Sequence, residues 1–251
     1  MNVYRLSTAL LFTIHCLTPL GAAAQARGGG AAPPSARASA PIDLTGYWVA
    51  VINEDWRYRM VTPPKGDYRG VPITKAALQI VNSWDPGADE AAGEQCKSYG
   101  AAAVMRLPAR LNITWQDDST LRVDIDAGTQ TRLFRFAPGG PAGGKPTWQG
   151  DSTAQWERGG GRGGAPTSGS LTVTTRNMRA GYLRKNGVPY SANANLTEYF
   201  DVSPSPGGQL LVVTTVVDDP QYLTQPFIVS SHFKKEADGS KWDPTPCSTR
   251  W

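Results

Sequence analysis

The sequence predicts an all-β fold, an antiparallel β-barrel of about 8–10 strands with one or two short helices. Segments that alternate between apolar and polar residues recur along the chain, and a period of two is typical of strands with one face in a core. Gly, Pro, Asn and Asp residues separate these segments at close spacing. A two-sheet β-sandwich is the alternative, because its strands alternate with the same period.

The N-terminal residues have the pattern of a secretory signal peptide. Arg5 precedes a mostly apolar run, and residues 24–26, Ala-Gln-Ala, fit a cleavage site. We therefore expect residues 1–26 to be removed after Ala26 and the protein to be periplasmic or secreted, with no transmembrane segment in the mature chain. Residues 27–41 contain no large apolar side chain and are predicted to form a disordered Gly/Ala/Pro tether. A single barrel domain is predicted over residues 42–251.

The elements are assigned in chain order. The first strand follows Gly46 and covers residues 47–52, and residues 56–60 are predicted as a further strand because aromatic residues alternate there with arginines. Residues 74–84 have the apolar spacing of a helix, with Thr74 as its N-cap, and residues 89–96 are expected to add a helical turn or two. Gly-rich segments 138–145 and 159–169 are predicted loops. The remaining predicted strands are residues 103–107, 111–116, 120–126, 130–136, 150–157, 170–177, 194–202, 209–217 and 226–235.

Charge, cysteine and histidine content exclude several functions. The formal net charge of +4 falls to +1 for the domain once Arg5 and the two tether arginines are left out, and no basic stripe is present, so nucleic-acid binding is not expected. Cys96 and Cys247 remain after export and most simply form a disulfide; metal ligation or a catalytic thiol would lack a nearby histidine. His232 is the one histidine of the mature chain, so we expect no metal site and no cofactor.

Two resemblances cover parts of the predicted domain. Residues 46–48, Gly-Tyr-Trp, are similar to the G-x-W motif of lipocalins, whose tryptophan plugs the closed end of a barrel of about eight strands. Residues 197–199, Thr-Glu-Tyr, loosely resemble the T-D-Y loop motif of that family. The chain also resembles a large, functionally uncharacterised group of exported bacterial proteins that begin DLTG-x-W, here residues 43–48. That resemblance extends to residues 148–152, 156–157, 171–175, 187–191, 196–200 and 219–220, and it implies a lipocalin-like barrel without any transferable activity.

Two charged side chains are predicted on apolar strand faces. Glu198 shares its face with Phe200, and Arg132 shares its face with Phe134. An unpaired buried charge costs several kcal/mol, so we expect the two to pair inside the barrel. The pair would either fix the strand register and close the barrel end against Trp48, or contact a ligand.

A second candidate site lies just after the first strand. Glu54 and Asp55 precede Arg57, with Trp56 beside it. One carboxylate could act as a general base while a guanidinium holds an anionic group. The alternative is an ordinary solvated strand face with alternating charges.

Three further residues are ligand-binding candidates on weaker grounds. Arg106 would face inward only if Val104 does. Tyr99 lies in a connecting segment, where an aromatic ring suits either an apolar ligand or loop packing. His232 could act in catalysis, and the alternative is a strand residue with a solvated ring.

These observations predict a protein that binds a small, partly apolar molecule in the barrel. One alternative is a metal-free lyase, isomerase or hydrolase, with Glu54, Asp55 or Glu198 as the acid and Arg57 or Arg132 as its partner. Another is an envelope protein-interaction module. A deep pocket with a carboxylate of raised pKa favours the enzyme, a deep apolar pocket favours the binder, and a barrel filled by its own side chains favours the interaction module.

Overall fold

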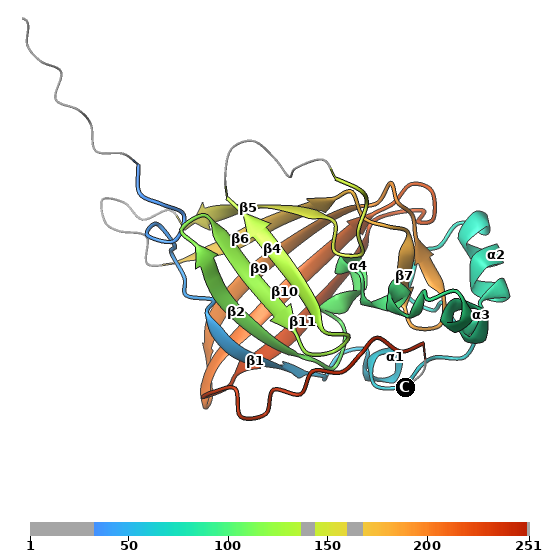
Figure 1. Cartoon of the computed structure of the whole chain (residues 1–251), viewed down its shortest axis with the longest axis horizontal. Helices are drawn as coiled ribbons and strands as arrows, with labels where there is room; N and C mark the ends of the chain where they lie inside the picture. Colours follow the sequence, from blue (N-terminus) through green and yellow to red (C-terminus); the bar gives the residue numbers. More distant parts are fainter. Residues whose placement is uncertain (1–32, 137–143, 160–167, 250–251) are drawn as a thin grey trace, which may run out of the picture. The chain divides into compact units, whose positions relative to one another are not determined.

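The computed structural model describes residues 33–136, 144–159 and 168–249 (Figure 1). Within these residues nine strands close a barrel in the order β1-β11-β10-β9-β6-β5-β4-β3-β2. The predicted barrel is therefore confirmed, and the sandwich alternative is wrong. The predicted signal peptide and most of the two Gly-rich segments lie outside the described residues. The barrel strands are β1 (Gly46–Val51), β2 (Arg110–Asp117), β3 (Thr120–Ile125), β4 (Gln130–Arg135), β5 (Asp151–Arg158), β6 (Gly169–Arg176), β9 (Asn195–Ser205), β10 (Gly208–Asp218) and β11 (Phe227–Lys235).

One junction of the barrel differs from the predicted antiparallel pattern. Strands β4 and β5 are parallel, with Phe134 opposite Ser152 and Arg135 opposite Thr153, whereas every other neighbouring pair is antiparallel. This parallel ladder is also short. A separate two-stranded sheet of β7 (Gly181–Arg184) and β8 (Val188–Tyr190) was not predicted.

Two predicted strands are helical. Residues 56–60 form α1 (Trp56–Arg59), because Asp55 adopts a left-handed conformation with φ 52° and turns the chain away from β1. Of residues 103–107, the first two belong to α4 (Ala101–Val104) and the rest form the turn that follows it. The alanines of α4 are all buried, and alanine has the highest helix propensity. A few alternating residues could not distinguish a strand from a single helical turn.

The helical part is larger than the one or two helices predicted. Helix α2 (Lys75–Ser83) is confirmed, and Thr74 caps it by accepting a hydrogen bond from the amide of Ala77. Helix α3 (Pro86–Ala91) and the 3₁₀ helix η1 (Gln95–Tyr99) follow. Figure 1 shows these helices and β7 gathered at one end of the barrel, with α4 nearest to the strands.

The barrel interior is packed with side chains. Trp48 is fully buried, donates its indole N–H to the carbonyl of Leu44 at 2.9 Å, and lies beneath Lys235 Nζ, 4.3 Å from the ring centroid. The rings of Phe134 and Phe200 meet edge to face at 5.4 Å. Val104 and Met105 from the α4 region belong to the same hydrophobic cluster, so α4 closes one end of the interior. Other fully buried members are Leu111, Ile113, Leu121, Ile125, Leu171 and Phe233.

Part of the predicted tether packs on the barrel. Trp156 donates its indole N–H to the carbonyl of Ala36 at 2.8 Å, and Arg158 donates to the carbonyl of Ser39 at 3.3 Å. Residues 36 and 39 therefore contact β5, while the disorder of the tether stays a prediction. Backbone carbonyls, which composition does not reveal, supply these contacts.

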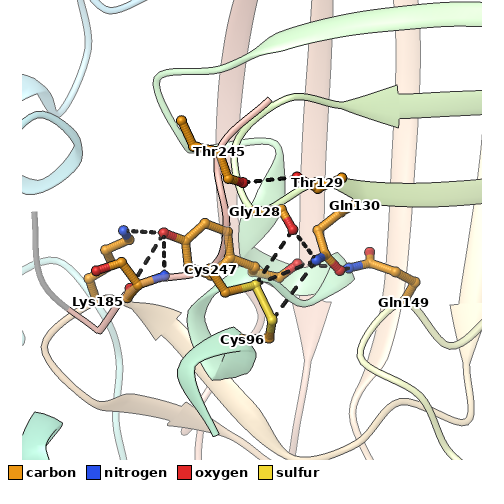
Figure 2. The surroundings of a disulfide bond; sticks show 10 residues. Cys96, Gly128, Thr129, Gln130, Gln149, Lys185, Thr245 and Cys247 are labelled. Atoms are coloured by element: carbon orange, nitrogen blue, oxygen red, sulfur yellow. Dashed lines mark hydrogen bonds between the residues drawn. A yellow bond between two sulfur atoms is a disulfide. The ribbon is translucent and has the colours of Figure 1, made fainter. Parts of the chain in front are cut away.

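The predicted disulfide between Cys96 and Cys247 is confirmed. Figure 2 shows it beside Gly128 and Gln130, and the side-chain amide of Gln130 donates to the carbonyl of Gly128 at 2.6 Å. The bond joins η1 to the C-terminal segment, which also accepts a hydrogen bond at 3.0 Å from Thr129 at the carbonyl of Thr245.

Candidate functional site

Arg132 and Glu198 form the predicted pair inside the barrel. Arg132 Nη1 and Nη2 donate to the two oxygens of Glu198 at 2.9 and 2.5 Å. Arg132 is 1% exposed and Glu198 is 0% exposed. Arg132 Nη2 also contacts Thr175 Oγ1 at 3.2 Å, and Thr175 in turn bonds Ser152 at 2.8 Å. The pair is enclosed by the packed core, which favours its structural interpretation over ligand contact.

The other predicted residues meet at the end of the barrel that carries the helices. Glu54 pairs with Arg59 and also contacts His232 Nδ1 at 3.1 Å through its second oxygen. Asp55 accepts a hydrogen bond from Arg106 Nη2 at 3.2 Å. These side chains come from the segment between β1 and α1, from α1, from the turn after α4, and from β11. The structure thus assembles four of the predicted candidates, Glu54, Asp55, Arg106 and His232, into one charged cluster.

A groove of about 470 Å³ runs beside α1. Trp56 and Val61 line it and are 61% and 59% exposed. The α1 turn explains this exposure, because it directs Arg59 into the protein and leaves Trp56 on the surface. The predicted ligand-binding candidates Trp56 and Arg57 both lie here. The complete lining is Trp56, Arg57, Tyr58, Val61, Thr62, Pro63, Pro64 and Asp67.

A smaller cavity of about 20 Å³ is lined by four buried cations, Arg59, Arg106, Arg184 and Lys185. Burial lowers the pKa of all four side chains, that of Arg184 to about 10 and that of Lys185 to about 8, and the charge of Arg106 lowers the pKa of Arg184 further. Sequence reasoning missed this cluster. Arg184 ends the short strand β7 and Lys185 follows it, without a recognisable pattern, so only the folded chain brings them to Arg59.

Tyr99, another predicted candidate, is buried and anchors the C-terminal segment. Its hydroxyl accepts hydrogen bonds from Lys185 Nζ at 2.7 Å and from the amide of Ser248 at 3.2 Å. Gly128 packs directly against the ring, where a Cβ atom would lie only 2.3 Å from Tyr99 Cδ1. These contacts give Tyr99 a packing role and connect the disulfide region to the cationic cavity.

The lowered pKa of Lys185 predicts a stability that rises with pH. Its folded pKa of about 8 lies below the ordinary lysine value of 10.5, so the unfolded chain binds the proton more tightly and protonation opposes folding at pH 8. Between pH 8 and pH 10 the free energy of unfolding should rise by at most about 2 kcal/mol through this group, less whatever solvent screens. Urea denaturation at pH 8, 9 and 10 should show this rise in the parent protein and a flatter profile in Lys185→Met. Equal slopes would contradict the assignment.

Metal clusters and membrane-spanning helices are both absent from the described residues. No group of three or more His, Cys, Asp or Glu side chains is placed there to hold a metal ion. None of the helices in these ranges combines the length and the hydropathy needed to cross a membrane. No protein-family model and no curated protein matches the chain.

Proposed function

We propose that the protein is an exported, lipocalin-like binder of a small, partly apolar molecule, which it holds in the groove beside α1 and not inside the barrel. The groove carries this proposal, because it combines the exposed rings and aliphatic groups of Trp56 and Val61 with a few polar groups, among them Arg57 and Asp67. Its volume of about 470 Å³ lies within the range of small-molecule sites. The buried side chains that pack the interior argue against a ligand site inside the barrel.

Export rests on the signal pattern of residues 1–26, and the disulfide accords with an oxidising compartment. The DLTG-x-W resemblance of residues 43–48 supports the same location. A binder in the envelope would meet its ligand outside the cytoplasm. A groove open to solvent requires no rearrangement of the barrel to admit it.

Removing the Trp56 ring should weaken binding at least about tenfold, because a large aromatic side chain at the centre of a site commonly contributes about 2 kcal/mol or more. The protein would be purified gently from the periplasm and examined by native mass spectrometry for a retained molecule. The affinity of the parent and Trp56→Ala for that compound, or for the apolar anion 1-anilinonaphthalene-8-sulfonate, would then be compared. Trp242→Ala is the matched control, since Trp242 packs near Tyr47 outside the groove. Equal losses in both variants, or none in either, would contradict the proposal.

A second candidate function is metal-free acid–base catalysis. His232 Nδ1 and Glu54 Oε2 lie 3.1 Å apart, both side chains are partly exposed, and Arg59 orients the carboxylate. Turnover would need both members of this pair, whereas binding in the groove would not. Glu198 is a poor acid for such a reaction because the core encloses it.

The interaction module uses the same exposed surface. Trp56, Met60 and Val61 are large apolar side chains on the outside of α1 and the segment that follows it. A barrel filled by its own side chains is compatible with this function. Native mass spectrometry separates the two cases, because a bound protein adds kilodaltons and a small ligand adds hundreds of daltons.

A further inference from the structure

We propose that three buried arginines, Arg59, Arg106 and Arg184, bind a small monovalent anion, a halide ion or a formate-sized carboxylate, in the cavity that they line. The site is distinct from the groove and requires no ligand there. Tyr58 lines both spaces.

The cavity has more positive than negative charge around it. Arg59 pairs with Glu54, and Arg106 pairs with Asp55. Arg184 makes no ion pair within the described part of the chain, and its Cζ instead lies 4.2 Å from the ring centroid of Tyr58. Lys185 adds a fourth cation to the same walls.

The two carboxylates also neutralise the cluster incompletely. The Glu54 and Asp55 side chains are partly exposed, so solvent screens their charges, whereas the arginines are almost fully buried. The lowered pKa values of the four cations reflect this burial. A bound anion would relieve the mutual repulsion of the cluster.

Three guanidinium nitrogens in the cluster need an acceptor. Arg59 Nη2, Arg184 Nε and Arg184 Nη1 are buried, and no described protein group accepts a hydrogen bond from them. Arg184 is 4% exposed and Arg59 is 3% exposed. Buried donors are nearly always satisfied, and leaving a charged one unsatisfied is costly. An anion in the cavity would accept from both residues.

The size of the cavity limits the class of anion. Its volume of about 20 Å³ is little more than the roughly 10–15 Å³ that one water requires. A halide ion or the head of a short carboxylate fits such a space, whereas a tetrahedral phosphate or sulfate does not. The apolar side chains of Ala103, Leu107 and Leu183 in its walls favour a weakly hydrated, singly charged ion.

The test replaces the arginine that has no carboxylate partner among the described residues. Arg184→Met removes one cavity charge and breaks none of the ion pairs described above. Arg122→Met is the matched control, because it removes a half-exposed arginine of β3, outside the cavity, that pairs with Asp124. The melting temperature would be measured at constant ionic strength while sodium gluconate is exchanged for sodium bromide, sodium formate or sodium phosphate.

We expect bromide or formate to raise the melting temperature of the parent and the control by about 3–6 °C at ten times the dissociation constant. Arg184→Met should lose most of this rise. Phosphate should give no rise that depends on Arg184. Trp56→Ala should respond to the anions as the parent does. The anion proposal is therefore tested independently of the proposed binding in the groove.

Three outcomes would overturn the proposal. The first is an equal rise in Arg184→Met, and the second is no rise in the parent with either small anion. The third is an Arg184-dependent rise that is larger with phosphate, which would contradict the size argument. If Arg184→Met does not fold, the parent protein would be crystallised in bromide. Anomalous density in contact with Arg184 and Arg59 would support the site, and no such density there would refute it.

Discussion

Replacing Glu198 by Gln is expected to lower the free energy of unfolding by about 3–5 kcal/mol, among the largest losses that one substitution causes. The change keeps the shape of the side chain but removes the charge that balances Arg132. Both side chains are fully buried and share two hydrogen bonds at 2.9 and 2.5 Å. The guanidinium would then remain charged in the core without a counterion.

Urea denaturation would measure the loss, with Glu157→Gln on the exposed surface of β5 as the control. The double variant Glu198→Leu with Arg132→Met should regain most of the stability, because an apolar pair can replace a buried ion pair at little cost. A loss below about 1 kcal/mol in Glu198→Gln would contradict the inference that the Glu198 charge is needed to neutralise Arg132 in the core.

The position of this pair explains its importance to the barrel. Arg132 is on β4 and Glu198 is on β9, and hydrogen bonds extend the network to Thr175 on β6 and Ser152 on β5. These strands span the short parallel junction of β4 with β5, where only two residue pairs are in register. The network therefore holds together the weakest ladder of the barrel. In Glu198→Gln, the amides of β4 and β5 should show the largest increase in hydrogen exchange.

The long strands could be predicted from the sequence because alternation sustained along a whole segment is rare outside a β-sheet. Glu198 and Arg132 were paired correctly for the same reason, since each lies on an apolar face of a clear strand. Residues 56–60 were misassigned because the left-handed turn at Asp55 and the contact of Arg59 Nε with the carbonyl of Arg106 decide their conformation. The second of these interactions joins residues far apart in the chain.

The cationic cavity could not be predicted for a related reason. Arg59, Arg106 and Arg184 come from α1, the turn after α4, and β7, and none of them follows a motif. The sequence also could not predict that β4 and β5 are parallel. Alternation shows which side of a strand is apolar but not the direction of the neighbouring strand. Local patterns predict the barrel, whereas tertiary contacts determine its charged end.

Removing the disulfide should have the second large effect. The bond joins residues separated by 151 positions, and loops of this length gain about 4–5 kcal/mol in the chain-entropy model, with about 2–5 kcal/mol typical of measured losses. The double variant Cys96→Ser with Cys247→Ser should therefore unfold at much lower urea concentration than the oxidised protein, and the reduced parent should match the variant. Equal stability of the variant and the oxidised parent would contradict this expectation.

Removing the disulfide should also loosen the wall of the cationic cavity. Tyr99 hydrogen-bonds both the C-terminal segment at Ser248 and the ammonium group of Lys185. Tyr99→Phe separates the two effects: it keeps the disulfide and loses only the hydrogen bonds of the hydroxyl group, so it should cost about 1 kcal/mol. Since thiols stay reduced in the cytosol, a chain that depends this strongly on one disulfide should reach full stability only in an oxidising compartment. This expectation agrees with the export proposed above from the signal pattern.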